Sequence, residues 1–241
     1  RKPEVKFSDS VETDLSRRDF TINAMALELT AKSPQLVDPY GGLDDLMARR
    51  LRTPLSPQES FNDDPLRMLR AARFVATLAV TPDDALVAAV KTMNERLQIV
   101  SAERIRNEFD RMMVTESPTL GLRLAVETGL ADRFLPELPA LSLEQDPIHR
   151  HKDVLTHTLA VVENVRPDMP GEFRITRLAA LFHDIGKPRT RKVMPDKGMT
   201  FYHHEVVGAK MTRKRMRELH YSNEDIRKVS ELVFLSGRFH T

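Results

Sequence analysis

The stretch that most constrains the fold is FNDDPLRMLRAARF at residues 61–74, because it predicts a helix with its chemistry on one face. Asn62 or Asp63 can cap this helix, and Pro65 suits its first turn. Its apolar side is formed by Leu66, Leu69, Ala72 and Phe74. Its other side carries, at every third position, Asp64, Arg67, Arg70 and Arg73. The spacing predicts a groove wall with one carboxylate and three guanidinium groups, although a solvated face with ion pairs is the commoner origin of such spacing.

Composition limits the class of protein and the kinds of site it can hold. With 241 residues and a hydrophobic fraction of 41%, the chain can form about one or two globular domains. Without cysteine it has neither disulfides nor a thiolate metal site, so any metal must bind through His, Asp or Glu. No apolar run approaches about 18 residues and no signal-peptide pattern is present, so we expect a cytoplasmic protein with no membrane partner. A net charge of +2 means that nucleic-acid binding must rest on local basic patches.

The first part of the chain has a mixed pattern. A short extended segment around Val5 and Phe7 precedes residues 17–29, where apolar residues at helical spacing predict a turn and then a helix capped at Asp19 or Thr21. The chain starts with Arg rather than Met, and its opening is typical of the middle of a domain. We therefore expect it to be a fragment.

The remainder is predicted to be helical, with short polar or proline-containing breaks. The expected helices are 63–80, 82–95, 101–114, 118–128, 153–165, 175–185, 204–219 and 223–235. Three prolines and little periodicity at 136–150 predict a domain boundary near residue 140.

The charged residues before and within the first long helix suggest nucleotide chemistry. Arg17 and Arg18 can grip phosphate, and Asp19 can accept from a ribose hydroxyl, although such a cluster is common on any surface. Asp64 beside Arg67 can pair with the edge of a nucleobase, because the amino group of adenine or cytosine donates to the carboxylate and the adjacent ring nitrogen accepts from the guanidinium. Such a pair admits ATP and CTP. It rejects UTP and GTP, whose oxygen at that place would face the carboxylate.

Three motifs in order resemble those of the class II tRNA nucleotidyltransferase family, which includes CCA-adding enzymes and bacterial poly(A) polymerases. They are DLSRRDFTINAMA at 14–26, VDPYGGLDDL at 37–46 and DDPLRMLRAARF at 63–74. The resemblance implies that Arg18 contacts the nucleotide phosphates and that Asp19 helps to recognise the ribose. It also implies that Asp64 and Arg67 act as a protein template for the incoming base. Arg70 is similar to a further nucleotide-contacting arginine.

One element of the family is missing. Its catalytic head begins with a Gly-Ser element and an Asp-x-Asp pair that holds two Mg²⁺ ions, and the 241 residues contain neither. Two-metal phosphoryl chemistry needs those carboxylates. We therefore expect the catalytic carboxylates upstream of residue 1, with Mg²⁺ as the cofactor of the parent protein, and no nucleotidyl transfer by the fragment alone.

The C-terminal part carries a second candidate site. Its potential metal ligands are His157, His183, Asp184 and His204. His183 and Asp184 are adjacent near the end of a predicted helix, where both can reach one ion whose shell the other two imidazoles complete. A core histidine is the commoner interpretation of any one of them alone.

This block resembles the HD superfamily of metal-dependent phosphohydrolases. The resemblance implies that the four residues bind a divalent metal and that a metal-bound water attacks a phosphoester. Mn²⁺, Ni²⁺ or Co²⁺ suits these ligands better than Mg²⁺. Ser236 lies where relatives place a further His or Asp and is a poor ligand, and Asp225 is only a distant substitute.

The fold expected overall is mainly α, with the C-terminal part of an α/β nucleotidyltransferase head at 1–60, a helical neck at 61–140 and an HD domain at 141–241. The expected function is addition of CMP and AMP to the 3′ end of tRNA, with CTP, ATP and tRNA as partners. Poly(A) addition, hydrolysis of nucleotides or RNA ends by the HD site, and an RNA-binding body without activity remain open alternatives. The basic run at 210–217 is either a solvated face or a phosphate contact for RNA.

Overall fold

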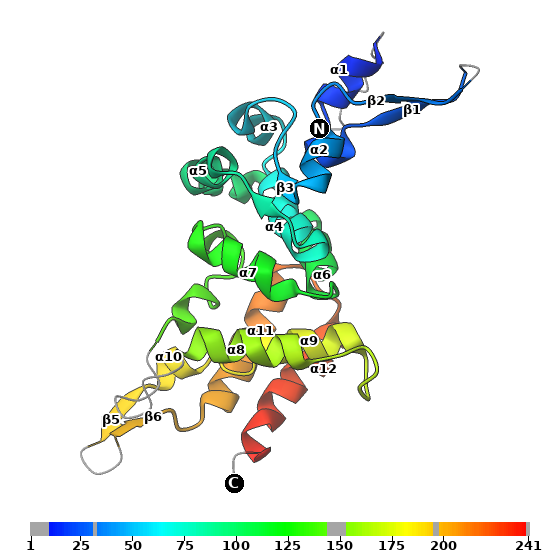
Figure 1. The fold of residues 1–241 in the computed structure, drawn as a ribbon. Helices are drawn as coiled ribbons and strands as arrows, with labels where there is room; N and C mark the ends of the chain where they lie inside the picture. The colour runs from blue at the N-terminus through cyan, green and yellow to red at the C-terminus, as the bar shows by residue number, and fades with distance from the viewer. Residues whose placement is uncertain (1–9, 31–32, 144–152, 195–197, 240–241) are drawn as a thin grey trace.

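The computed structural model describes residues 10–30, 33–143, 153–194 and 198–239. The described chain is mainly helical, which confirms the predicted fold class. It is elongated in Figure 1: α1, α2 and the β1–β2 hairpin lie at one end, α4, α6 and α7 in the middle, and α10 and α12 at the other end.

The first part of the chain carries short strands as well as helices. Its elements are α1 (Val11–Ser16), the 3₁₀ helix η1 (Thr21–Asn23), β1 (Ala26–Glu28), β2 (Gln35–Val37), α2 (Gly42–Met47), β3 (Arg50–Leu51), α3 (Pro57–Asp63) and α4 (Leu66–Leu78). β1 pairs antiparallel with β2, and β3 pairs in parallel with β4 (Thr81–Pro82). The predicted extended segment at Val5 and Phe7 lies outside the described residues.

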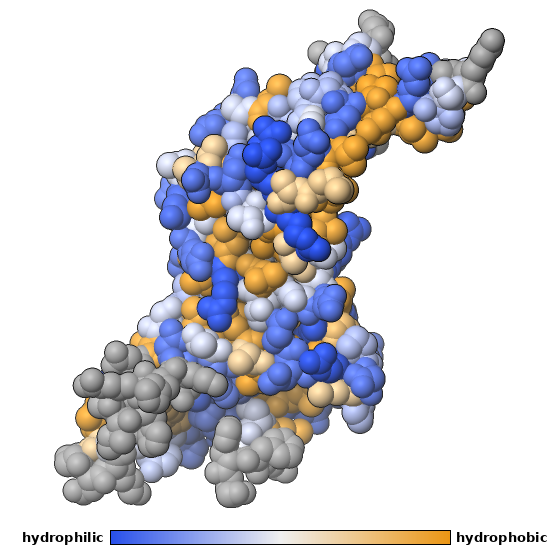
Figure 2. All heavy atoms as spheres, viewed as in Figure 1, coloured by the Kyte–Doolittle hydropathy of each residue, from blue (hydrophilic) through white to orange (hydrophobic). Residues whose placement is uncertain are grey.

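The helix predicted within 17–29 is wrong. The chain forms one 3₁₀ turn, which the Asn23 side chain closes by accepting from the Phe20 N–H at 3.1 Å, and then continues as strand β1. Pairing with β2 provides hydrogen-bond partners along one edge of β1, so hairpin formation overrides the local helical spacing. The hairpin leaves Leu27, Leu29 and Leu36 exposed, and Figure 2 shows apolar side chains along this arm.

The helix predicted at 63–80 begins later than its pattern indicates. Asp64 has an extended backbone (φ −145°, ψ 101°) and separates α3 from α4, which starts at Leu66. A residue before proline is disfavoured in the helical region, so Pro65 keeps Asp64 out of the helix. Arg67, Arg70 and Arg73 do lie on α4, but Asp64 approaches from the preceding turn.

The middle and last parts confirm the other predicted helices to within a few residues. The middle elements are α5 (Asp84–Met93), η2 (Asn94–Ile99), α6 (Ala102–Met113), α7 (Pro118–Glu127), η3 (Ala131–Arg133) and η4 (Pro139–Leu141). The last elements are α8 (Val154–Asn164), α9 (Phe173–Phe182), α10 (Lys187–Thr190), β5 (Lys192–Met194), β6 (Gly198–Thr200), α11 (His204–Glu218), α12 (Asn223–Leu235) and η5 (Ser236–Phe239). The β5–β6 hairpin was not expected, and its short strands are mostly exposed.

One continuous core runs through these parts, from Phe20 to Val233. Leu138 and Leu141, within the predicted linker, belong to this core, whereas Pro147 lies outside the described residues. No helix among the described residues is long and apolar enough to cross a membrane.

Polar contacts also join the middle of the chain to its last part. The Tyr221 hydroxyl donates to Asp110 Oδ1 on α6 at 2.5 Å. Arg174, on α9, contacts Asp110 at 3.2 Å and Asp225 at 2.8 Å. Asp225 is therefore held at this junction by Arg174, and it does not belong to the group of His157, His183 and Asp184 that could hold a metal.

Candidate functional site

A polar pocket of about 510 Å³ opens where η1, the α3–α4 turn and α6 meet. Its lining residues are Arg17, Arg18, Asp19, Asn23, Asp64, Leu66, Arg67, Arg70, Arg104, Asn107, Glu108 and Arg111. All five residues predicted to bind nucleotide are among them. The pocket thus brings together segments as far apart in the sequence as Arg17 and Arg111, which are 94 positions apart.

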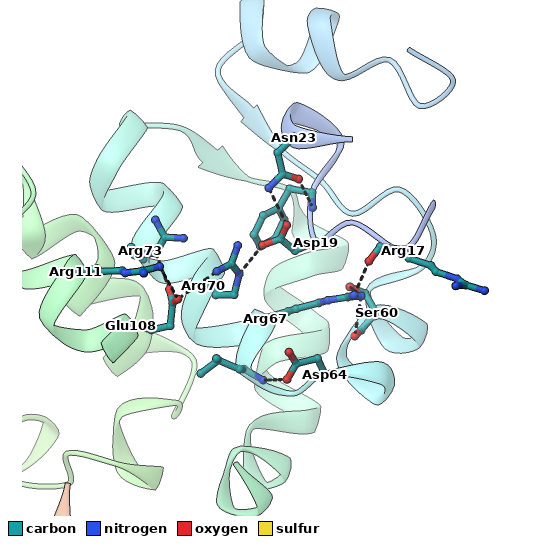
Figure 3. Close-up of polar contacts among 12 residues, drawn as sticks. Arg17, Asp19, Asn23, Ser60, Asp64, Arg67, Arg70, Arg73, Glu108 and Arg111 are labelled. Atoms are coloured by element: carbon teal, nitrogen blue, oxygen red, sulfur yellow. Dashed lines mark hydrogen bonds and ion pairs between the residues drawn. The ribbon is translucent and has the colours of Figure 1, made fainter. Parts of the chain in front are cut away.

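A chain of charged groups forms the inner wall of the pocket (Figure 3). Arg70 Nε donates to Asp19 Oδ2 at 2.6 Å, and its Nη1 donates to Glu108 Oε1 at 3.1 Å. Arg73 Nε donates to Glu108 Oε2 at 2.6 Å. Both carboxylates are buried, with Asp19 8% and Glu108 5% exposed. Short ion pairs of this kind offset the free-energy cost of removing the charged groups from water.

Asp19 is held as an anion. Burial alone would raise the pKa of its carboxyl, but hydrogen bonds from Arg70 and Asn23 and the Arg70 charge prevail, so the pKa of Asp19 lies below its ordinary value. Asn23 Nδ2 supplies its bond at 2.7 Å to Oδ1. Both oxygens of Asp19 therefore have protein partners.

Asp64 and Arg67 line the same pocket, but each is bonded to other groups. Asp64 Oδ2 accepts from Arg104 Nη2 at 2.6 Å, and its Oδ1 accepts from the Leu66 N–H at 3.2 Å. Arg67 Nη1 donates to Ser60 Oγ at 3.0 Å, and its Nη2 donates to the Arg17 carbonyl at 2.5 Å (Figure 3). The Asp64 carboxylate and the Arg67 guanidinium therefore each have protein partners of their own.

Arg18 also lines the pocket. Its side chain is half exposed and contacts Asp14 Oδ2 at 3.2 Å, one helical turn earlier. Exposed pairs at this spacing contribute little to stability, so the guanidinium can exchange this partner for a ligand.

The second candidate site lies at the end of α9. The nitrogen or oxygen ligand atoms of His157, His183 and Asp184 all lie within 4.8 Å of one another. Asp184 is fully buried, and its Oδ1 has no hydrogen-bond partner among the described residues. His204 Nε2 lies 3.5 Å from this oxygen, and Lys187 Nζ lies 2.8 Å from Oδ2. The structure therefore gathers three predicted imidazole ligands around the carboxylate of the fourth, with His204 outside the most compact group.

The hydrogen bonds of two imidazoles indicate what this cluster can hold. His183 Nδ1 lies 2.7 Å from the Ala180 carbonyl, and His204 Nδ1 lies 3.0 Å from the Phe201 carbonyl. A carbonyl only accepts, so each Nδ1 carries a proton, and each ring presents its Nε2 to Asp184. Two imidazole nitrogens beside one buried carboxylate are a donor set that fits a divalent metal.

The charge of Asp184 agrees with this arrangement. Burial alone would raise the pKa of the Asp184 carboxyl, but the imidazole of His183 and the ammonium of Lys187 hold that pKa well below its usual range. Gly186 lets the turn approach α11 closely, since a Cβ there would lie 2.0 Å from the His204 carbonyl oxygen. Ser236 donates to the Val233 carbonyl at 2.7 Å, in keeping with its being a poor ligand.

The basic run on α11 does not form one stripe. Arg215 is bonded to Glu137 at 2.8 Å, and Arg213 Nε donates to Ser230 Oγ at 3.1 Å. Lys214 is largely exposed. These side chains point in different directions, which favours the solvated interpretation.

Three family models match the chain, each over a different part. Residues 1–52 match the poly A polymerase head domain, 80–141 match the probable RNA and SrmB-binding site of polymerase A, and 154–238 match the HD domain. The A-adding tRNA nucleotidyltransferase of Deinococcus radiodurans is 36% identical over 236 residues, which are 95% of this chain and 53% of that protein. A multifunctional CCA protein of Actinobacillus pleuropneumoniae is 34% identical over 242 residues, covering 96% of this chain and 56% of that protein.

The chain belongs to the class II family of CCA-adding enzymes and poly(A) polymerases. It spans about half the length of the curated relatives it matches. Its fold is shared by the crystal structure of the Bacillus stearothermophilus CCA-adding enzyme in complex with CTP, with a TM-score of 0.64 and 24% identity over 96% of this chain and 49% of that one.

In this class II chain the polar pocket is lined by residues from two family matches and from the segment between them. Arg18 and Asp19 fall within the head match, Arg104 and Glu108 fall within the RNA-binding match, and Asp64 lies between them. That the pocket residues bind nucleotide and the His-Asp cluster binds metal stays a prediction.

Sequence reasoning missed the wall that α6 contributes to the pocket. Its members, Arg104, Asn107, Glu108 and Arg111, recur at the spacing of one helix face. That spacing was visible within the predicted helix 101–114. Only the packing of α6 against α4 shows which way the face points.

Proposed function

We propose that this chain is part of a tRNA nucleotidyltransferase that adds CMP and AMP to the 3′ end of tRNA from CTP and ATP. The observation that carries the proposal is the gathering of Asp64 and Arg67 in one pocket with Arg18 and Asp19. Relatives that match 95% and 96% of the chain are named as a tRNA nucleotidyltransferase and a CCA protein, which supports the same class of reaction. We also propose the division into head, neck and HD domain at about residues 60 and 140.

The base is selected by hydrogen bonds from the protein. The amino group of cytosine or adenine donates to the Asp64 carboxylate, and Arg67 donates to the neighbouring ring nitrogen. In the structure, Arg67 Nη1 donates to Ser60 and Nη2 donates to the Arg17 carbonyl. To donate to the base, Arg67 therefore breaks one of these two hydrogen bonds. Uracil and guanine place an oxygen opposite Asp64, and two acceptors repel one another.

The sugar and phosphates bind toward the mouth of the pocket. Arg18 holds the phosphates, since its half-exposed guanidinium can donate two parallel hydrogen bonds. Asp19 accepts from the ribose with a lone pair that Arg70 and Asn23 leave unused, and Arg70 keeps that carboxylate charged and in place.

The described pocket does not fit the Mg²⁺ expected for nucleotidyl transfer. Asp19, Asp64 and Glu108 each accept from an arginine, which takes the place a cation would need. The 241 residues also contain no Asp-x-Asp pair. We therefore assign no catalytic carboxylate to this chain, and we expect no nucleotidyl transfer from these residues alone.

The pocket does not distinguish CCA addition from poly(A) addition, because both use a base with an amino group. The D. radiodurans relative is named for A addition alone, so the use of CTP is the feature to test. tRNA is the proposed acceptor. The neck would contact it, because residues 80–141 match a model described as a probable RNA-binding site.

A second function rests on the His-Asp cluster. Asp184 Oδ1 has no hydrogen-bond partner in the described part of the chain, and the Nε2 atoms of His183 and His204 lie beside the carboxylate. These observations favour a bound Mn²⁺, Ni²⁺ or Co²⁺ held by His157, His183, Asp184 and His204. Such a metal would supply an activated water for hydrolysis of a phosphoester. Nucleotides and RNA ends are the proposed substrates.

Replacing Arg18 by Ala tests the nucleotide pocket. We expect binding of CTP and of ATP to weaken alike, by about ten- to a hundredfold, because a hydrogen bond to a charged group contributes about 1.5–3 kcal/mol. Isothermal titration of the whole protein with each nucleotide measures the effect. Arg123→Ala, an exposed arginine on α7 outside the pocket, is the control and should change neither affinity. Unchanged affinity with a lowered melting temperature would assign Arg18 a structural role instead.

A further inference from the structure

We propose that Arg104 is a positioning residue for base selection: it fixes the Asp64 carboxylate in the orientation that discriminates between nucleobases. The inference rests on the proposed function, and it adds a residue outside the motifs that suggested that function. Arg104 Nη2 donates to Asp64 Oδ2 at 2.6 Å across 40 positions of sequence. Both side chains line the nucleotide pocket.

Asp64 needs such a partner because its own backbone leaves it loosely held. It lies in an extended turn between two helices, and one local hydrogen bond, from the Leu66 N–H to Oδ1 at 3.2 Å, restrains its side chain. A single bond permits rotation of the carboxylate about that oxygen. The Arg104 bond to the other oxygen fixes the plane of the group.

The fixed carboxylate still has capacity for a ligand. An ionised carboxylate can accept about four hydrogen bonds, and Arg104 and Leu66 use two. A free lone pair therefore remains on each oxygen for a base amino group. Because the carboxylate is already oriented before the base binds, binding does not have to supply the entropy cost of ordering it. An acceptor in a fixed orientation therefore favours the base whose amino group meets it.

Arg104 is itself held by a well-anchored helix. The Arg104 N–H donates to the N-cap Ser101 Oγ at 3.4 Å, in the first turn of α6. Further along α6, Asp110 accepts from Tyr221 at 2.5 Å and contacts Arg174 at 3.2 Å, so the last part of the chain fixes the position of this helix. The guanidinium is therefore presented to Asp64 from a rigid element.

The salt bridge has little consequence for stability. About half of the Arg104 side chain is exposed, and pairs of this kind contribute little to the free energy of unfolding. Its effect is expected on selectivity instead. If Arg104 only competed with the base for Asp64, its removal would tighten nucleotide binding.

The test is Arg104→Met in the whole protein, which keeps the apolar stem and removes the donor. Single-nucleotide addition to tRNA gives the ratio of kcat/KM for CTP to that for UTP. We expect this ratio to fall about tenfold with an unchanged melting temperature, and Arg104→Lys to restore part of it. Arg106→Met is the matched control: it removes the same charge from the same helix, but Arg106 donates to the His220 carbonyl outside the pocket, so the ratio should hold.

An unchanged ratio in Arg104→Met, or tighter CTP binding, would overturn the inference. Asp64→Ala separates this failure from failure of the proposed function. If Asp64→Ala relaxes selectivity and Arg104→Met does not, only the role of Arg104 is wrong. If neither variant relaxes it, base selection by Asp64 is wrong as well. In the double variant the two effects should be far from additive, because both act through one carboxylate.

Discussion

The variant His183→Ala with Asp184→Ala is expected to lose uptake of Mn²⁺, Ni²⁺ and Co²⁺. Asp184 is the carboxylate on which the cluster converges, and His183 Nε2 lies 3.2 Å from it, so the double change leaves two imidazoles without the charge between them. Removing only an outer-shell partner of a metal typically lowers affinity by about 10–100-fold. Loss of two direct ligands should exceed that. Titration of metal into both proteins after chelator treatment measures it.

His203→Ala is the matched control for this metal experiment. His203 adjoins His204 in the sequence, but its side chain is 82% exposed, and the residue does not belong to the cluster. Its replacement should leave metal uptake unchanged. Equal uptake by the unaltered protein and the double variant would exclude the site. Assays on a 2′,3′-cyclic nucleotide and on a generic phosphodiester then separate a catalytic metal, which hydrolyses one of them, from a structural one.

The variant Glu108→Ala is expected to lower the free energy of unfolding by about 3 kcal/mol. This value lies at the low end of the range for breaking a buried ion pair. Arg70 would still be paired with Asp19, and the side chains of Arg70 and Arg73 are both partly accessible to water. Glu108 is 5% exposed and accepts from Arg70 and Arg73 together, so its loss leaves two guanidinium groups short of a partner. Urea denaturation followed by circular dichroism measures the change.

Glu103→Ala controls for the loss of a carboxylate from the same helix. Glu103 is exposed and contacts His220 on the protein surface, so a much smaller change is expected. Equal stability losses in the two variants would show that the arginine–carboxylate chain of the pocket has no special role in holding α4 and α6 together.

Local sequence patterns predicted the helices better than the strands. From residue 61 on, the apolar spacing that marks α5, α6 and α7 also describes the faces they bury, so local and tertiary preferences agree. At residues 17–29 they conflict, because strand pairing with Gln35–Val37 decides the structure. The β5–β6 hairpin was missed because its strands are only three residues long and mostly exposed.

Some members of the candidate site were predictable from the sequence, but the α6 wall of the pocket and the contacts within the site were not. Motifs identified Arg18, Asp64 and Arg67, and the structure places them around one pocket. The partners of these groups come from far along the chain: Arg70 contacts Asp19 across 51 positions, and Arg104 contacts Asp64 across 40. Such pairings depend on how helices pack, which no local spacing encodes. The restriction that Pro65 places on Asp64 was readable from the sequence and was overlooked.

The central claim is that Asp64 and Arg67 select the base, and single-nucleotide addition by Asp64→Ala tests it most directly. Each of the four nucleoside triphosphates is offered separately to the whole protein with a tRNA acceptor, and kcat/KM is measured. Loss of one hydrogen bond to the base should remove about 1–3 kcal/mol of discrimination, which is about 5–150-fold. In Asp64→Ala, kcat/KM for UTP and GTP is expected to rise relative to kcat/KM for CTP and ATP. An unchanged preference for CTP and ATP would contradict it.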